Sequence, residues 1–191
     1  MRAVLDTCVL YPPILREILI GTARAGAYEP VWSDAILDEW RHIAARDGAE
    51  NQMLVASEIA RLTAHFPDAG TEVAETDMRD LYLPDRHDVH VLAAARKAQA
   101  ALIVTANLRD FPKSVLAPWA MDAVHPDAFL RDMWLADPSM VGSVIETVID
   151  QASVLAGTQV SARALLKRAR LPRLAKAMAR GASDGPASPG H

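Results

Sequence analysis

The sequence predicts an α/β protein in which helices cover a short parallel sheet, followed by a smaller helical part. Two apolar segments, 2–5 and 102–105, are typical of buried strands, and several helical patterns separate them. Strands joined through helices pair in parallel, which is the arrangement of an α/β sandwich. The length of 191 residues corresponds to one domain of roughly 150 residues and an appendage.

Three amphipathic helices are expected in the first half of the chain. Pro13 is suited to the first turn of a helix, and Ser33 is a good N-cap for the next one. Apolar residues at helical spacing give each helix one inward face. The expected helices are 13–26, 34–48 and about 50–65.

A polar loop over 77–87 leads into the second half of the chain. An alanine-rich helix over 88–99 and the strand 102–105 follow it, and 121–124 is a candidate for a further strand. Only helical patterns remain after that point. The expected helices of this appendage are 127–136, 139–156, 161–170 and 172–180.

Composition excludes several classes of protein. No apolar run approaches the ~20 residues of a membrane span, and the N-terminus reaches a charge after five residues, so we expect a soluble cytoplasmic protein. The single cysteine, Cys8, rules out an internal disulfide and a cysteine-rich zinc site, and we expect it to be a small core residue. No glycine lies between Gly70 and Gly142, which excludes phosphate-binding loops there.

Charge is unevenly distributed along the chain. Residues 1–150 hold 13 Lys/Arg against 23 Asp/Glu, whereas residues 151–183 hold seven Lys/Arg and no acid. Such a basic segment suggests a nucleic acid or an acidic protein as partner, and a solvated helix face is the simpler alternative.

Four carboxylates are candidates for a common site. Ligands of open α/β sheets bind at the carboxyl ends of strands, where Asp6 follows the first strand and Asp110 lies five residues past Thr105. Asp88 begins a helix, and Glu39 lies at the edge of an apolar helix face. Caps or solvated positions would also explain Glu39, Asp88 and Asp110 individually.

Carboxylates that converge in one cleft repel one another unless cations lie between them. Hard divalent ions such as Mg²⁺ or Mn²⁺ prefer oxygen ligands, and such ions activate water and neutralise phosphate in phosphodiester hydrolysis.

Several motifs, in the same order, resemble those of PIN-domain nucleases over about residues 2–130. The matching segments are Val4-Leu5-Asp6-Thr7-Cys8-Val9-Leu10-Tyr11-Pro12, Leu15-Arg16-Glu17, Val31-Trp32-Ser33-Asp34-Ala35-Ile36-Leu37-Asp38-Glu39-Trp40, Pro84-Asp85-Arg86-His87-Asp88-Val89-His90-Val91-Leu92-Ala93-Ala94-Ala95 and Ile103-Val104-Thr105-Ala106-Asn107-Leu108-Arg109-Asp110-Phe111-Pro112. The resemblance implies a three-layer α/β/α sandwich with a short parallel sheet and a helical C-terminal subdomain.

The resemblance also implies the chemistry of the site. It implies a catalytic and metal-binding set of Asp6, Glu39, Asp88 and Asp110, with Thr105 and Asn107 as supporting polar residues. The members most similar to this chain are VapC toxins, which cut RNA with Mg²⁺ or Mn²⁺ and are blocked by a VapB antitoxin. A tRNA or rRNA substrate, a VapB-like partner and a homodimer are the corresponding expectations.

The flanks of the site hold candidates for RNA contacts, because arginine forks match phosphate oxygens. These are Arg16, Arg86, His87 and Arg109. The third motif departs from the family, since Arg86 and His87 stand where relatives have Pro-Asp. Asn107 leaves Asp110 as the only acid of the fourth motif.

Two alternatives remain beside the nuclease. The altered motifs are compatible with a catalytically weak module that binds RNA or protein. The pair His87-Asp88, with His90 nearby, superficially resembles the His-Asp pair of metal phosphohydrolases, which needs an all-helical scaffold. The expected organisation is a nuclease-like domain over 1–130, a basic helical extension over 131–180 and a flexible tail over 181–191.

Overall fold

A five-stranded, fully parallel sheet with the order β3-β2-β1-β4-β5 forms the centre of the computed structural model, which describes residues 1–183. The strands are β1 (Arg2–Leu5), β2 (Glu29–Ser33), β3 (Gly70–Thr71), β4 (Leu102–Val104) and β5 (Asp122–Val124). The helices are α1 (Thr7–Leu10), α2 (Pro13–Arg24), α3 (Asp34–Arg46), α4 (Ala49–His65), α5 (Glu75–Met78), α6 (Val89–Lys97), α7 (Lys113–Leu116), α8 (Pro126–Ala136), α9 (Pro138–Ala156), α10 (Ala162–Arg168) and α11 (Pro172–Ser183). Three short 3₁₀ helices are η1 (Arg86–Asp88), η2 (Leu108–Asp110) and η3 (Ala117–Trp119).

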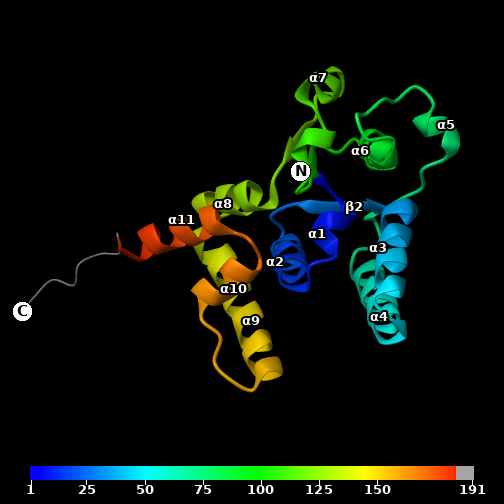
Figure 1. Cartoon of the computed structure of the whole chain (residues 1–191). Helices are drawn as coiled ribbons and strands as arrows, with labels where there is room; N and C mark the ends of the chain where they lie inside the picture. Colours follow the sequence, from blue (N-terminus) through cyan, green and yellow to red (C-terminus); the bar gives the residue numbers. More distant parts are fainter. Residues whose placement is uncertain (184–191) are drawn as a thin grey trace, which may run out of the picture.

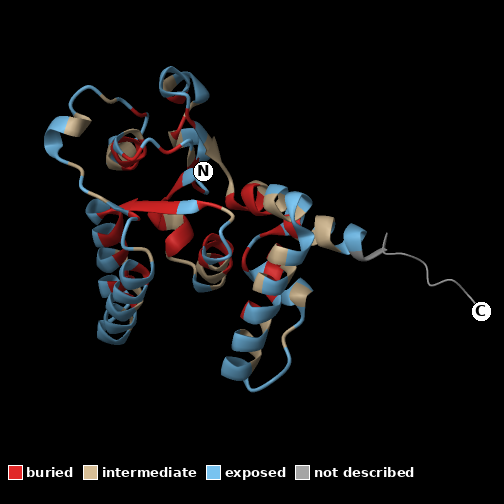
Figure 2. Cartoon of the chain, turned by 180° about the vertical axis from the view of Figure 1, so that it is seen from behind, coloured by how far each residue is buried: buried red, intermediate tan, exposed pale blue. Residues whose placement is uncertain are grey.

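Helices cover both faces of the sheet, so the predicted α/β sandwich is confirmed. α6 lies on one face, and α1 and α2 lie on the other, as both views show (Figures 1 and 2). Ala93, Ala94 and Ala95 of α6 are fully buried, because small side chains let this helix approach β1, β2 and β4 closely. The buried residues concentrate along the sheet between the two layers (Figure 2).

β1 is the central strand because its side chains are apolar on both sides. Ala3, Val4 and Leu5 are fully buried, as expected for a parallel strand that is covered on both faces. β1 pairs with β2 on one side and with β4 on the other, with Leu5 opposite Val104. This register brings the carboxyl ends of β1 and β4 side by side.

The sequence analysis predicted no strand over Glu29–Ser33 and none at Gly70–Thr71, and both omissions were wrong. Pro30 argues against an inner strand, because proline has no N–H to donate. Here β3 pairs with β2 only from Trp32 onward, so no neighbouring strand needs a donor from Pro30 on that side. Ser33 ends β2 and caps α3 by accepting a hydrogen bond from the Ile36 amide.

The C-terminal helices α8 to α11 form a group on one side of the molecule, away from α3 and α4 (Figure 1). α9 packs on α2 and α8, and α11 packs on α8. The expected boundary at residue 130 falls within α8, so we propose that the helical extension begins with that helix. α11 continues through the first residues of the expected tail to Ser183, and 184–191 lie outside the described residues.

A buried carboxylate joins α8 to α11. Asp127, only 4% exposed, accepts hydrogen bonds from the backbone amides of Arg173, at 2.9 and 3.0 Å, and of Leu174, at 3.0 Å. These amides belong to the first turn of α11, where N–H groups have no partner within the helix. Asp127 therefore caps α11 from a neighbouring helix and matches the positive end of its dipole.

Gly21 makes the close approach of α2 to α9 possible. A Cβ atom at this position would lie 2.5 Å from Cγ1 of Val144, whose β-branched side chain has little rotamer freedom in a helix. We expect Gly21→Ala to lower the free energy of unfolding by about 1 kcal/mol, because an overpacking cost of ~1–3 kcal/mol exceeds the gain of about 1 kcal/mol in helix propensity. Urea denaturation measures this loss.

The double variant Gly21→Ala/Val144→Ala is the matched control for this contact. Removing the Val144 methyl groups relieves the clash, so the second substitution should restore stability in the Gly21→Ala background and lower it in the wild type. Additive effects of the two substitutions would contradict the contact.

None of the helices within residues 1–183 combines the length and the apolar character that a membrane crossing requires.

Candidate functional site

The carboxyl ends of β1 and β4 hold the first two polar residues of the site. Asp6 follows β1, and its amide donates to the Val104 carbonyl at 3.2 Å, which extends the pairing by one residue. Thr105 follows β4 in the same way and donates its amide to Val124 of β5 at 3.1 Å. Strand pairing therefore places both side chains at the same edge of the sheet.

Asp6 is held in a small hydrogen-bonded group. Its Oδ2 accepts from the Thr105 hydroxyl at 2.7 Å and from the Cys8 thiol at 3.0 Å, and both Asp6 and Thr105 are buried. Thr105 Oγ1 in turn accepts from the Asn107 amide at 3.0 Å, and Cys8 Sγ accepts from the Ala106 amide at 3.2 Å. These contacts fix the orientation of the Asp6 carboxylate.

Cys8 is a thiol donor and not a nucleophile in this arrangement. Burial, followed by the negative charge of Asp6, raises the pKa of Cys8 to about 12, so the thiolate is scarce at neutral pH. Cys8 is partly exposed beside the site, and it packs against the hydrophobic core as the sequence led us to expect.

Glu39 reaches the same region from α3. The Thr7 hydroxyl, at the start of α1, donates to Glu39 Oε2 at 2.9 Å and also lies 3.1 Å from the Ile36 carbonyl. His90 of α6 places its Nε2 3.7 Å from Glu39 Oε2. Burial lowers the pKa of His90, against the opposing pull of Glu39 and Asp6, so the ring is mostly neutral at pH 7.

Asp88, at the end of η1, shows that the carboxylates converge. Its pKa is raised to about 6, first by burial and then by the negative charges of Asp6, Asp85, Asp110 and Glu39. Repulsion of this kind requires the other carboxylates to lie near Asp88. The structure therefore brings together the four acids that the sequence nominated and adds Asp85 as a fifth.

The donor set of this group suits a hard divalent cation. Its side chains offer carboxylate oxygens, which Mg²⁺ and Mn²⁺ prefer over nitrogen or sulfur. Within residues 1–183, no three His, Cys, Asp or Glu side chains already stand close enough to hold a metal ion together. The carboxylates are thus neighbours that would have to draw closer around an ion, which would offset the repulsion recorded at Asp88.

The candidates for RNA contacts fall into two groups. Arg86, His87 and Arg109 are exposed, and their side chains form no ion pair or hydrogen bond within the described part of the chain. Arg16 instead donates to the carbonyls of Leu10 and Tyr11, at 2.8 and 3.3 Å, and lies over the Trp40 ring. Arg16 therefore supports the fold around α1, and we leave it out of the proposed RNA surface.

Sequence reasoning did not assign Thr7, Asp85 or His90 to the site. Asp85 and Thr7 lie beside nominated acids in the quoted motifs, which is a signal that a close reading of those motifs could have used. The contact of His90 with Glu39 joins α6 to α3 and depends on tertiary packing, so spacing along the chain carries no sign of it.

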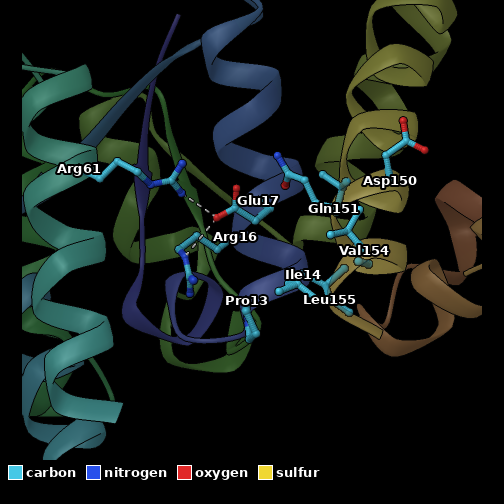
Figure 3. A pocket seen from close by; sticks show the side chains of 11 residues that line it. Pro13, Ile14, Arg16, Glu17, Arg61, Asp150, Gln151, Val154 and Leu155 are labelled. Carbon is cyan, nitrogen blue, oxygen red and sulfur yellow. Dashed lines mark hydrogen bonds and ion pairs between the residues drawn. The ribbon is translucent and has the colours of Figure 1, made fainter. Parts of the chain in front are cut away.

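The largest cleft lies elsewhere in the molecule. Its volume is about 710 Å³, and α2, Arg61 of α4 and the last turns of α9 line it (Figure 3). Glu17 and Arg61 form an ion pair of 2.9 Å at its polar end, and Ile14, Val154 and Leu155 face it from the apolar side. None of the five converging carboxylates lines this cleft.

The parallel sheet and the acids at its carboxyl edge define a class of nuclease fold. The chain belongs to the PIN-domain family, because a sequence profile described as "PIN domain" matches residues 2–109, more than half of the chain. The family resemblance drawn from the motifs is confirmed. The all-helical phosphohydrolase alternative is wrong, because the chain has a parallel sheet.

One named relative gives a narrower similarity. The chain is similar to "Putative ribonuclease VapC50" of Mycobacterium tuberculosis, with 53% identity over 45 residues. This match spans 24% of the present chain and 27% of that protein, well under two thirds of its length. No solved structure matches the chain.

Thr105→Val tests the support that Thr105 gives to Asp6. The substitution removes the donor to Asp6 Oδ2 and the acceptor of the Asn107 amide. We expect RNA cleavage to fall by about 10- to 100-fold, as is typical of groups that orient metal ligands. The loss of buried hydrogen bonds should also lower the free energy of unfolding by about 1–3 kcal/mol.

Initial rates and urea denaturation measure the two effects. Thr105→Ser keeps the hydroxyl and is the matched control, so it should retain most of the activity. Equal activity of the valine and serine variants would contradict the orienting role.

Proposed function

We propose that this protein is a metal-dependent endoribonuclease that hydrolyses RNA phosphodiester bonds, and that it is the toxin of a type II toxin–antitoxin pair. Membership in the PIN-domain family and the partial similarity to a VapC ribonuclease support a nuclease role. The observation that carries the proposal is the raised pKa of Asp88, which reports the convergence of several carboxylates at the carboxyl edge of the sheet.

In this proposal Asp6, Glu39, Asp88 and Asp110 hold Mg²⁺ or Mn²⁺. Such an ion, when bound, supplies positive charge that lowers the pKa of water and stabilises the charge that develops on phosphate. Thr105 and Cys8 orient Asp6, Asn107 lies beside Thr105, and Thr7 orients Glu39. The exposed Arg86, His87 and Arg109 would contact RNA phosphates at the rim.

The partners follow from the same proposal. The substrate is an RNA with a defined structure, such as a tRNA or rRNA, in the cytoplasm. A VapB-like antitoxin would block the acidic site, and pairing of two copies of the chain is a further expectation.

Incubation of the purified protein with a mixed tRNA and rRNA pool tests the nuclease. We expect discrete fragments with Mn²⁺ or Mg²⁺, and none with EDTA or with the double variant Asp6→Asn/Asp88→Asn. Glu146→Gln, at an exposed acid of α9, is the control for loss of one negative charge. Cleavage that persists in EDTA or in the double variant would refute the proposed chemistry.

A binding module without catalysis is the second candidate. The presence of Asn107 and of Arg86-His87 in the acidic motifs favours it, because each reduces the negative charge available for a cation. A binder should show no metal-dependent cleavage and should keep its RNA affinity in the Asp6→Asn variant. An RNA-binding measurement on both proteins therefore separates the candidates.

A further inference from the structure

A second cleft lies between α8 and α11, at the beginning of α9. Its volume is about 520 Å³, and it contains none of the five converging carboxylates. Its charged lining residues are Arg131, Arg173, Lys176 and Arg180, and its aromatic lining residue is Trp134. No acidic side chain lines it.

The positive charge of this cleft is largely uncompensated. Arg173, Lys176 and Arg180 occur at helical spacing on α11 and are exposed, and within residues 1–183 none of them forms an ion pair. Arg131 is the exception, because its guanidinium contacts Asp132. Three like charges on one helix face repel one another, so a bound polyanion would remove this repulsion.

Trp134 adds an apolar, planar contact to the charged lining. Its side chain is half-buried, and Gly142 of α9 and Gly181 of α11 flank the indole. A Cβ atom at either glycine would lie 3.5 Å from the ring. Cations along a groove together with an aromatic ring match single-stranded nucleic acid, in which phosphates pair with the cations and an unpaired base contacts the ring.

The cleft is preformed because Asp127 fixes its two walls. The three hydrogen bonds from the Arg173 and Leu174 amides hold the start of α11 against α8. Trp134 lies on α8 and the three free cations lie on α11, so this cap fixes the distance between the ring and the charges. A ligand therefore does not have to order the helices when it binds.

We propose that the cleft between α8 and α11 binds a single-stranded segment of the RNA substrate, as a second contact outside the acidic site. This inference rests on the proposed ribonuclease function. It assigns a role to the basic half of the C-terminal extension that is separate from cleavage.

Binding of a short single-stranded RNA over a series of salt concentrations tests the proposal. The full chain with Asp6→Asn serves as the background, so that the RNA stays intact. The cleft variant is Arg173→Gln/Lys176→Gln/Arg180→Gln. The matched control is Arg163→Gln/Lys167→Gln/Arg168→Gln, which removes the same charge from exposed positions of α10 that do not line the cleft.

We expect the cleft variant to bind at least about tenfold more weakly at 0.15 M salt, while the control stays within about threefold of the background protein. The slope of log K against log salt should fall by about 2 in the cleft variant, because each neutralised phosphate of a single strand contributes about 0.7. Equal affinities and slopes for the two variants would overturn the proposal and leave the cleft to an acidic protein.

Tryptophan fluorescence gives a second readout that does not depend on charge. RNA should quench part of the emission, and Trp134→Phe should remove that change while the melting temperature stays close to that of the background protein. Quenching that persists in Trp134→Phe would show that RNA does not reach the ring.

The failure of this inference differs from the failure of the proposed function. A protein that cleaves RNA, with cleft and control variants of equal affinity, keeps the nuclease and loses the second contact. A protein that neither cleaves nor binds RNA loses both.

Discussion

Asp6→Asn is expected to reduce RNA cleavage by more than about a hundredfold. Substitution of groups that merely orient metal ligands costs about 10- to 100-fold, and Asp6 is the carboxylate that such groups orient here. The asparagine oxygen can still accept from Thr105 and Cys8, so the fold should be retained. Initial cleavage rates with Mn²⁺, compared with Glu146→Gln, measure the loss.

The same variant should change the acidity of its neighbour. Asp6 contributes the largest charge effect on Asp88, so its neutralisation should move the pKa of Asp88 down from about 6 toward the usual range. NMR titration of the carboxyl carbons in the metal-free protein measures this shift. An unchanged pKa of Asp88, together with retained cleavage, would place Asp6 outside the catalytic group.

Asp88→Asn is expected to stabilise the metal-free protein while it abolishes cleavage. The pKa of Asp88 is about 6 in the folded protein and 3.8 as its ordinary value, so the folded state binds the proton more tightly. Stability from this group is therefore complete below about pH 4 and is lost as the pH rises through 6. Asparagine carries no such charge, so the variant should be more stable at pH 7.5 by about 1–2 kcal/mol, a value reduced for partial solvent screening.

Urea denaturation in EDTA at pH 4.5, 6 and 7.5 measures this difference. The gain of Asp88→Asn over the wild type should grow with pH across this series. Added Mn²⁺ should stabilise the wild type more than the variant, because the ion binds the intact carboxylate group. A variant that is less stable than the wild type at every pH would contradict the repulsion at this site.

The sequence was most informative where apolar runs and caps coincide. β1, β4 and β5 were predicted from apolar segments, and the α3 N-cap from Ser33. β2 was missed because Pro30 is a poor strand residue in isolation, and its place in the sheet depends on which neighbour needs a donor. β3 has only two residues, too few for any periodic pattern.

The candidate site shows the same division between local and tertiary information. Asp6 and Asp110 could be nominated because strands end before them, which is a local signal. The roles of Thr7 and His90 depend on where α1 and α6 lie relative to Glu39. Arg16 shows the reverse error, since a position next to the motifs suggested a phosphate contact, whereas its guanidinium bonds to backbone carbonyls.

The cap formed by Asp127 has a consequence for the order of events during synthesis. A nascent chain that ends before Arg173 contains α8 but lacks the two amides that pair with its buried carboxylate. An unpartnered buried carboxylate is costly, so α8 cannot settle fully onto the rest of the protein until α11 has emerged from the ribosome. Completion of the C-terminal helices therefore falls at the very end of translation, and a shortened product would carry this defect in a helix that it retains.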